Sequence, residues 1–407
     1  MRRVNQLLSQ LAPRGVRFLP LGDLVSANRG GGTPSRSVDA YWGGPIPWAS
    51  VGDLSIRGLS IESTRASITE VGLGKSSSTL VEAGDVIVAT KISPGRMKIA
   101  GVDMAINQDL RGLSLRSEIE ARFLSYFFAS VRVLGRGSIV KAITNPELER
   151  ILIPVPPIEV QREIVRILDN FTELEAELEA ELEARRVQHA HFRDSMLAAN
   201  SSEGSMVKLD QVVEITIGFP FKSSQFSDDD ADVALVRGDN IGQGSMKGRE
   251  FKRWKRTSHD GLHGYELSQG DVVLAMDRPW IPAGLKWATI SGDVLPALLV
   301  QRVARLRSAL HELDQRYLAT VISSAAFTRH ILDVQTGNTV PHISGRQIGS
   351  FQFPLPSLSD QRRIVSALES LDALVNDLSI GLPAELAARR KQYEYYRDKL
   401  LTFEELV

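Results

Sequence analysis

The sequence predicts an α+β protein in which two globular α/β domains are separated by two long antiparallel helices. Two observations predict this fold. The chain resembles itself at an offset of 200 residues, so that Pro154-Val155-Pro156 returns as Pro354-Leu355-Pro356. Each of these segments is followed by a long run of residues that favour helices. We therefore expect an internal pseudo-twofold repeat, in which one structural plan is used twice.

The repeat is clearest where each long helix begins. Gln161-Arg162 matches Gln361-Arg362 at the same offset, and Ala184-Arg185-Arg186 matches Ala388-Arg389-Arg390 at an offset of 204. The globular parts correspond more loosely, with residues 84–89 resembling 270–275 and residues 51–54 resembling 237–240. Helices that stay alike while the globular parts diverge suit one scaffold that presents two different surfaces.

The elements follow in the same order in both copies. We expect short strands broken by glycine and proline, such as 84–89, then a short helix at 118–133 with its counterpart at 313–331, and a Pro-x-Pro segment that ends each domain. The predicted boundaries are an N-terminal arm at 1–15, a first globular domain at 16–157, a central helix at 158–200, a second globular domain at 201–356 and a C-terminal helix at 357–407.

The first long helix is predicted from about Glu159 to Ala199. Residues 174–184 are only Leu, Glu and Ala, which are strong helix formers, and the leucines recur every four residues on one face. Such a stripe needs a partner, and the obvious one is a second helix from about Ser359 to Phe403, interrupted near Gly381-Leu382-Pro383. The alternative is a solvated acidic helix within one domain.

The composition is that of a folded soluble protein, with 43% hydrophobic and 24% charged residues among 407. The formal net charge of −1 gives no overall basic field, although a local basic surface can be offset by an acidic helix. The absence of cysteine excludes disulfides and thiolate chemistry and suits a reducing compartment. We find no signal peptide or membrane span, so we expect a cytoplasmic protein without membrane association.

The sequence holds no convincing catalytic constellation. Residues 72–76 lack the glycine that a phosphate-binding loop needs at position 69, and we interpret them as a polar turn. Asp239, Glu250 and Lys252 loosely resemble the acidic and basic set of a metal-dependent nuclease, which stays open as an alternative function. We predict no catalytic, cofactor-binding or metal-binding residues.

Basic residues gather on the predicted loops of both copies. Lys91, Arg96 and Lys98 flank Pro94-Gly95, and Arg36 follows a glycine-rich loop. In the second copy, basic residues interleave with aromatic ones over 247–256 and again around Trp280. Lysine and arginine neutralise phosphates, and Arg, Asn and Gln can read base edges. This pattern favours nucleic-acid binding.

Several segments carry a family resemblance. Gly31-Gly32-Thr33-Pro34 and residues 41–48 resemble the opening of a target-recognition domain, and residues 381–401 resemble a distal helix, in the specificity subunits of type I restriction–modification systems. The Pro-x-Pro segments with their Gln-Arg pairs resemble that family's helix entries. The resemblance covers the chain apart from about fifteen residues at its start.

The resemblance implies a non-catalytic subunit. Each of two target-recognition domains would bind one half of an asymmetric, bipartite site in double-stranded DNA, and the helices would set the spacing between the halves. The subunit would dock two methyltransferase subunits, which hold S-adenosylmethionine, and restriction subunits would join the complex; this chain itself would need no cofactor. The rival from another class is a two-domain coiled-coil scaffold that binds proteins and no DNA.

We select candidate DNA contacts by residue type and loop position. The candidates in the first domain are Arg36, Lys91, Arg96, Lys98, Asn107 and Gln108. The candidates in the second domain are Arg237, Asn240, Arg278, Trp280, Lys286 and His342.

Overall fold

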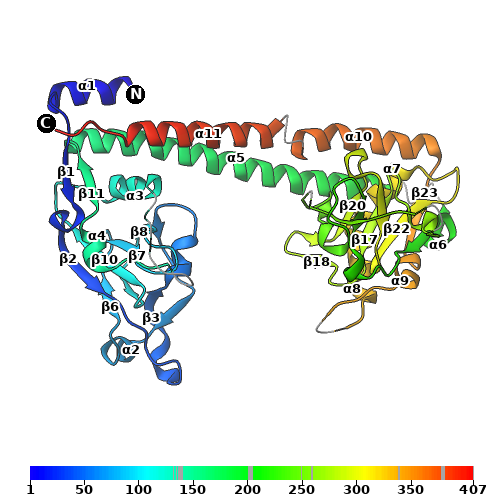
Figure 1. Cartoon of the computed structure of the whole chain (residues 1–407), viewed down its shortest axis with the longest axis horizontal. Coiled ribbons are helices and arrows are strands. Elements are labelled where there is room, and N and C mark those ends of the chain that lie inside the picture. Colours follow the sequence, from blue (N-terminus) through cyan, green and yellow to red (C-terminus); the bar gives the residue numbers. More distant parts are fainter. Residues whose placement is uncertain are drawn as a thin grey trace. The chain divides into compact units, whose positions relative to one another are not determined.

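The computed structural model describes residues 1–131, 133, 135, 141–199, 205–248, 250–257, 260–337, 340–376 and 381–406. It divides into two compact units, residues 1–179 with 385–407 and residues 180–384 (Figure 1). Each unit combines β-sheets with helices, which confirms the predicted α+β class. The predicted boundary between residues 200 and 201 lies outside the described residues.

The first unit is built on a five-stranded and a four-stranded sheet. The five-stranded sheet has the order β2-β10-β7-β8-β4 and the four-stranded sheet the order β5-β3-β9-β6, while β1 pairs with β11. The strands are β1 (Arg17–Pro20), β2 (Val25–Gly30), β3 (Trp42–Ala49), β4 (Ser60–Ile61), β5 (Ala66–Ile68), β6 (Thr79–Val81), β7 (Val86–Ala89), β8 (Met97–Ala100), β9 (Met104–Ile106), β10 (Leu110–Leu115) and β11 (Leu152–Val155). The helices of this part are α1 (Arg2–Leu11), α2 (Glu70–Gly74), α3 (Ala121–Ser130) and α4 (Asn145–Glu149).

The second unit repeats this plan. Its five-stranded sheet has the order β13-β22-β17-β20-β15, its three-stranded sheet the order β16-β14-β21, and β12 pairs with β23. The strands are β12 (Ser205–Lys208), β13 (Val213–Ile217), β14 (Val233–Val236), β15 (Gln243–Gly244), β16 (Lys252–Trp254), β17 (Val272–Ala275), β18 (Trp280–Ile281), β19 (Gly284–Leu285), β20 (Trp287–Thr289), β21 (Ala297–Leu299), β22 (Val303–Ser308) and β23 (Gln352–Leu355). The helices are α6 (Leu209–Val212), α7 (Gln315–Ile322), α8 (Ala325–Val334) and α9 (Gly345–Gly349).

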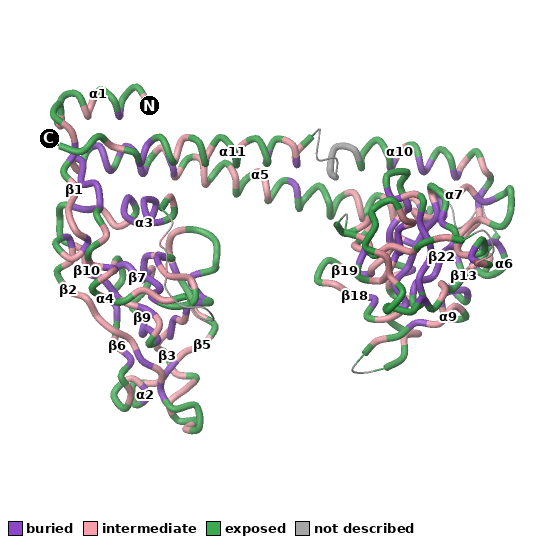
Figure 2. Tube along the Cα trace, viewed as in Figure 1, coloured by how far each residue is buried: buried purple, intermediate pink, exposed green. Residues whose placement is uncertain are grey.

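The two units share unusual details of sheet pairing. In each, the short edge strand of the five-stranded sheet runs parallel to its neighbour, β4 with β8 and β15 with β20. In each, one strand pair of the smaller sheet is also parallel, β3 with β9 and β14 with β21. The central strands β7 and β17 are buried along their whole length (Figure 2). This agreement confirms the internal repeat at the level of topology.

The long helices lie where the sequence predicts them. Helix α5 (Ile158–Ala199) is continuous over 42 residues, and the second run consists of α10 (Leu358–Asn376) and α11 (Gly381–Leu400). In the first unit, α11 packs antiparallel along α5, because Phe171 stacks on Tyr396 at 5.5 Å between ring centroids and Glu175 accepts a hydrogen bond from Arg390 at 2.8 Å. The predicted helix pairing is therefore confirmed within this unit, and the solvated-helix alternative does not hold there.

One glutamine at the start of each long helix ties the helix to its domain. Gln161 is fully buried; its side-chain amide donates to the carbonyl oxygens of Glu118 and Pro156 and accepts from the backbone N–H of Glu120, all at 2.8–2.9 Å. Gln361 repeats each of these three bonds in the second unit, at 2.7–2.8 Å. The Pro-x-Pro…Gln signature is thus a structural joint between domain and helix.

Three details of the sequence interpretation are corrected. The helix expected at 313–331 is two helices, α7 and α8, because α7 ends at its C-cap Ser323 and the hydroxyl of Ser324 caps the start of α8. Residues 70–74 form a short helix capped by Thr69, so the polar turn predicted at 72–76 is limited to Lys75 and Ser76. The match of 51–54 with 237–240 is shifted by one residue: Asp53 closes a capping box on Ser50, and the equivalent box on Arg237 is closed by Asn240.

In the described part of the chain, no helix is both long and apolar enough to cross a membrane.

Candidate nucleic-acid interface

Three loops meet at one end of the first domain's five-stranded sheet. They are the β7–β8 connection, the turn between β9 and β10, and the segment before α4. The backbone N–H of Thr90 donates to the carbonyl of Asp109 at 2.9 Å, and the N–H of Ile92 donates to the carbonyl of Lys141 at 2.9 Å. These bonds bring several predicted contact residues together on one loop cluster.

The second domain builds the same cluster from its own loops. The N–H of Met276 donates to the carbonyl of Arg302 at 2.8 Å, and the N–H of Arg278 donates to that of Pro341 at 3.0 Å. Ile92 and Arg278, which occupy the same place in this frame, both have left-handed backbones, with φ of 69° and 47°. Non-glycine residues adopt such angles at a cost, and they gather at functional sites.

The basic candidates on the β7–β8 connection differ in how they are held. The Lys91 ammonium pairs with the Asp109 carboxylate at 2.9 Å, and Arg96 donates to the Ser55 hydroxyl at 2.6 Å; both side chains remain exposed. Lys98 instead donates to the carbonyls of Ile56 and Gly58. Burial, and to a lesser degree the charge of Arg96, lowers the pKa of Lys98. Lys98 therefore braces a loop and is a poor candidate for a DNA contact.

Two tryptophans hold the glycine-rich loop that carries Arg36. The Trp48 indole N–H donates to the carbonyl of Gly32 at 3.1 Å, and the Trp42 indole N–H donates to that of Ser35 at 3.1 Å. The two rings meet edge to face at 5.2 Å. Arg36 is exposed in the turn beyond these anchors, so the loop presents its guanidinium to solvent.

Asn107 and Gln108 are neighbours with opposite surroundings. Asn107 is buried, and its side-chain oxygen accepts from the backbone N–H of Asp109 at 3.0 Å. Gln108 is exposed beside it and forms a hydrogen bond with Thr33 of the glycine-rich loop. The side chain of Gln108 is therefore accessible to solvent, whereas that of Asn107 is bonded to the backbone of the turn.

Asn240 and Arg237 of the second domain form one local structure. Asn240 is buried; its oxygen accepts from the backbone N–H of Arg237 at 3.2 Å, and its amide donates to the carbonyl of Glu250 at 3.1 Å. The Arg237 guanidinium pairs with Asp239 at 3.2 Å and is partly exposed. Asn240 is thus structural, whereas Arg237 remains available for a contact.

The remaining candidates of the second domain fall into two groups. Arg278 and His342 are exposed and adjacent in the loop cluster, where His342 Nδ1 bonds the Asp277 carboxylate. Trp280 packs against the core and donates its indole N–H to Gln335 at 2.6 Å, while Lys286 is half-buried between β19 and β20. The loop cluster therefore gathers Arg278 and His342, and Trp280 supports the fold.

Two residues of the loop clusters were missed by sequence reasoning. Arg302 is exposed, pairs with Asp277 at 3.0 Å and has a left-handed backbone with φ of 66°. Ile92 is an exposed aliphatic side chain at a strained position. Strands β9 and β10 are related to β21 and β22 by an offset of 193 residues. The same offset aligns Arg302 with Asp109 and would have indicated that both lie in the loop clusters.

The residues of the nuclease alternative are engaged elsewhere. The Asp239 carboxylate pairs with Arg237, while the bond between Glu250 and Asn240 uses only the backbone carbonyl of Glu250 and does not engage its carboxylate. Among the described residues, no group of three or more His, Asp or Glu side chains lies close enough together to hold a metal ion.

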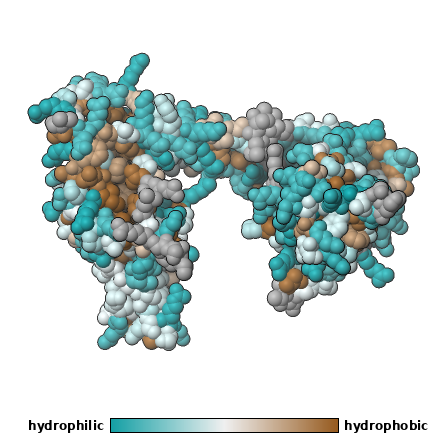
Figure 3. Space-filling view, viewed as in Figure 1, coloured by the Kyte–Doolittle hydropathy of each residue, from teal (hydrophilic) through white to brown (hydrophobic). Residues whose placement is uncertain are grey.

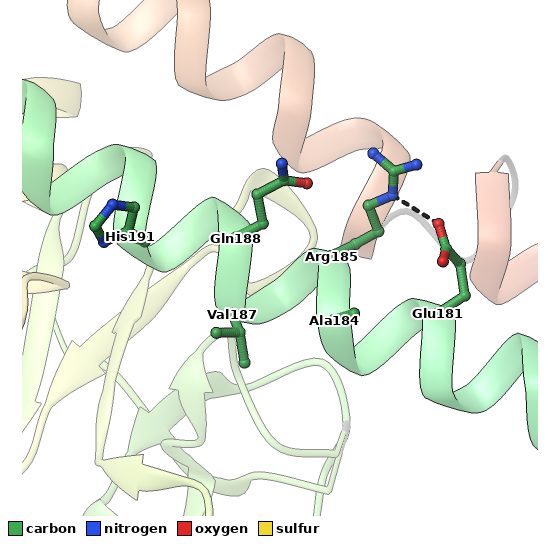
Figure 4. A pocket seen from close by; sticks show the side chains of 6 residues that line it. All are labelled: Glu181, Ala184, Arg185, Val187, Gln188 and His191. Carbon is green, nitrogen blue, oxygen red and sulfur yellow. Dashed lines mark hydrogen bonds and ion pairs between the residues drawn. The ribbon is translucent and has the colours of Figure 1, made fainter.

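A shallow open groove lies along α5 in the second unit. It is lined by Glu181, Ala184, Arg185, Val187, Gln188 and His191 (Figure 4). Arg185 donates to Glu181 at 2.8 Å, and Val187 is largely exposed. In the first unit, Leu152 of β11 is also exposed, and Figure 3 shows apolar residues gathered over that part of the unit. Exposed apolar side chains of this kind mark surfaces for protein partners.

Comparison with known proteins gives one consistent family. The model of the type I restriction modification DNA specificity domain matches residues 13–184 and 202–388. The EcoR124I/EcoR124II specificity subunit of Escherichia coli is 31% identical over 64% of this chain, and the MjaVIII specificity subunit of Methanocaldococcus jannaschii is 28% identical over 59%. The chain spans 65% and 60% of the lengths of these two relatives, less than two thirds.

Two further matches extend over most of the chain. The EcoprrI specificity subunit of Escherichia coli is 24% identical over 89% of both chains. A solved structure described as underlying complex assembly and conformational transition of the type I R-M system covers 96% of this chain and 98% of its own, with a TM-score of 0.61 and 18% identity. At that identity the structural match supports the fold alone.

Proposed function

We propose that this chain, which belongs to the family of type I restriction modification DNA specificity domains, is the non-catalytic subunit that recognises DNA for such a system. Each domain would bind one half of an asymmetric, bipartite site in double-stranded DNA. The observation that carries the proposal is the pair of equivalent loop clusters, which share a backbone frame and differ in side chains. One frame with two sets of side chains suits a reader of two unlike half-sites.

The contact residues we propose are the exposed members of these clusters and of the adjoining loops. They offer the chemistry of direct readout: guanidinium and ammonium groups for guanine or phosphate, an amide for adenine, and an aliphatic group for the thymine methyl. They are Arg36, Lys91, Ile92, Arg96 and Gln108 in the first domain and Arg237, Arg278, Arg302 and His342 in the second. Lys286 is partly exposed, as Arg237 is, and stays a candidate, whereas Lys98, Asn107, Asn240 and Trp280 are assigned structural roles.

The long helices would dock the catalytic partners. We propose that two methyltransferase subunits, which would hold S-adenosylmethionine, and restriction subunits assemble on this chain. The exposed groove on α5 and the apolar area around Leu152 support protein docking. We further propose that the length of α5 sets the distance between the two DNA half-sites. The globular domains that it connects would span about residues 16–157 and 201–356. One added Leu-Glu-Ala-Glu unit would lengthen α5 by about 6 Å and widen the gap between half-sites by one or two base pairs.

The test is selection from a random-sequence duplex library with the methyltransferase partner present. We expect the bound fraction to contain two short unlike motifs at a fixed gap. Removal of a side chain that contacts a base should change preference at one position by about 1–3 kcal/mol, whereas removal of a phosphate contact should weaken binding to all sequences alike. Enrichment of no motif at physiological salt would contradict the proposal and favour a scaffold that binds proteins only.

A further inference from the structure

The two loop clusters contain the same ion pair with its charges exchanged. Lys91 follows β7 at the position where Asp277 follows β17, an offset of 186 residues that also relates the two strands. Asp109 precedes β10 where Arg302 precedes β22, an offset of 193 that again relates the strands. The first domain thus has its cation on the β7–β8 connection, and the second has its cation on the β21–β22 turn.

The geometry of the pair is conserved although the residues are not. The Lys91 Nζ lies 2.9 Å from Asp109 Oδ1, and an Arg302 guanidinium nitrogen lies 3.0 Å from Asp277 Oδ2. The backbones beneath are joined by the same hydrogen bond, from Thr90 to Asp109 and from Met276 to Arg302. An ion pair across this joint therefore belongs to the plan of both domains, and only its polarity differs.

Exposure separates the roles of the two partners. The cations are the open members, with side chains 48% exposed for Lys91 and 70% for Arg302. The carboxylates lie beneath, 16% exposed for Asp109 and 23% for Asp277. A molecule that approaches either cluster meets the cation first, and the carboxylate orients that cation from below.

A carboxylate at this distance also selects what the cation can bind. A DNA phosphate would gain the attraction of the cation but would be repelled by the carboxylate about 3 Å behind it. The neutral acceptors of a guanine edge, O6 and N7, feel much less of that repulsion and are the usual partners of arginine and lysine in the major groove. The pair therefore favours a base over the backbone.

We propose that this exchanged ion pair determines specificity in both domains, with Lys91 and Arg302 contacting a guanine edge and Asp109 and Asp277 as positioning residues. The proposal rests on the proposed function, because it names the base class that the loop clusters would read. It also explains why the two domains can read different half-sites on one backbone. The cation comes from a different loop in each, and lysine is a point charge where arginine is a planar fork.

The first domain is the better place for a test, because the second side-chain partner of Asp109 is the distant Gln108 amide, which donates at 3.4 Å, whereas Asp277 also makes a close bond to His342. Two variants of the full chain are compared with the unaltered chain in the random-duplex selection, and a third, Lys91→Asp alone, is compared with them in thermal melting. Lys91→Ala removes the cation. The double variant Lys91→Asp with Asp109→Arg gives the first domain the polarity of the second. Arg17→Ala in β1 and Lys208→Ala in β12 are matched controls that remove one exposed cation outside the loop clusters.

The expected result is local. Lys91→Ala should lose a guanine preference of about tenfold at one position of the first half-site, with the second half-site unchanged. The double variant should melt within a few degrees of the unaltered chain and shift the preferred base or its position in the first half-site only. Lys91→Asp alone, which leaves two carboxylates facing each other, should lower the melting temperature, and Asp109→Arg should restore it.

Any other result of the selection overturns either this inference or the proposed function. If the unaltered chain selects two motifs and both variants retain the first one, the inference fails and the proposed function stands. Weakening by a similar factor for all sequences, with a smaller salt dependence, would mean that Lys91 contacts phosphate, and this also overturns the inference. If the unaltered chain selects no motif, the proposed function fails and the inference fails with it.

Discussion

The two recognition domains agree in the parts that hold the backbone and differ in the parts that face outward. Gln161 and Gln361 make the same three hydrogen bonds, and the sheets follow the same order with the same parallel pairs. The exposed loops share their backbone bonds, yet Lys91 stands where the other domain has Asp277. Buried polar groups constrain a sequence because each lacks an alternative partner, whereas an exposed side chain can change freely.

The attachment of each domain to its helix shows a smaller difference. In the first unit, Asp169 of α5 accepts from Arg122 and from the Tyr126 hydroxyl, each at 2.7 Å. Burial raises the pKa of Tyr126, so its hydroxyl stays protonated and donates. In the second unit, Glu369 of α10 receives only longer bonds from Arg316, at 3.3 and 3.4 Å, and both side chains are exposed. The first domain should therefore be held more firmly by its helix.

The largest expected effect tests what the two domains share. Gln161→Ala and Gln361→Ala each leave one partly buried N–H and two carbonyls without their side-chain partner, which should lower the free energy of unfolding by about 2–4 kcal/mol in either domain. Chemical denaturation followed by hydrogen exchange of the two domains measures both losses. Gln188→Ala, at an exposed position of α5, is the control and should cost less than about 0.5 kcal/mol. A loss of stability from only one of the two substitutions would contradict the conclusion that Gln161 and Gln361 play the same part.

A middle-sized effect tests the attachment of domain to helix. Asp169→Asn weakens two short bonds and should cost about 1–2 kcal/mol, because hydrogen bonds to a charged group are the stronger kind. Glu369→Gln weakens an exposed pair and should cost less than about 0.5 kcal/mol. Thermal unfolding of both variants provides the measurement. Equal losses would mean that the second domain is held as firmly as the first.

The smallest expected effect is on stability at low pH. It distinguishes Asp53 from Asn240, which close equivalent capping boxes in the two domains. Burial alone would raise the pKa of Asp53, but hydrogen bonds from Arg65 and Ser50 outweigh it and hold the pKa below its usual value. A depressed folded pKa contributes stability above the unfolded value of about 3.9, and that stability is lost as the pH falls below it. Asn240 cannot titrate, so its box has no such dependence.

Asp53→Asn should therefore leave the box closed and reduce the acid sensitivity of residues 47–66. Hydrogen exchange of this segment at pH 3 and at pH 6 gives the measurement, with the segment around Asn240 as the internal reference. The unaltered chain should lose protection of 47–66 at pH 3, and the variant should lose less. An identical loss in both proteins would show that Asp53 is not the titrating group.

The composition of the loop clusters could be predicted in part. Residue type and loop position identified Lys91, Arg278 and His342, which the fold gathers into the loop clusters. The same reasoning selected Asn107 and Asn240, whose side chains are buried on backbone groups. It missed Arg302, since nothing local distinguishes an exposed arginine after a glutamine. An asparagine that shapes a turn and one that reads a base look alike until burial is known.

The sequence alone determined the repeat, the α+β class, the extent of α5 and the start of a separate helix, α11, at Gly381, because periodicity, helix propensity and Pro-x-Pro punctuation are local properties. Tertiary structure decided the register of Asp53 against Asn240, the division of one expected helix into α7 and α8, and the pairing of Lys91 with Asp109. Each of these depends on partners distant along the chain, and the order of residues does not specify which polar groups will be buried together.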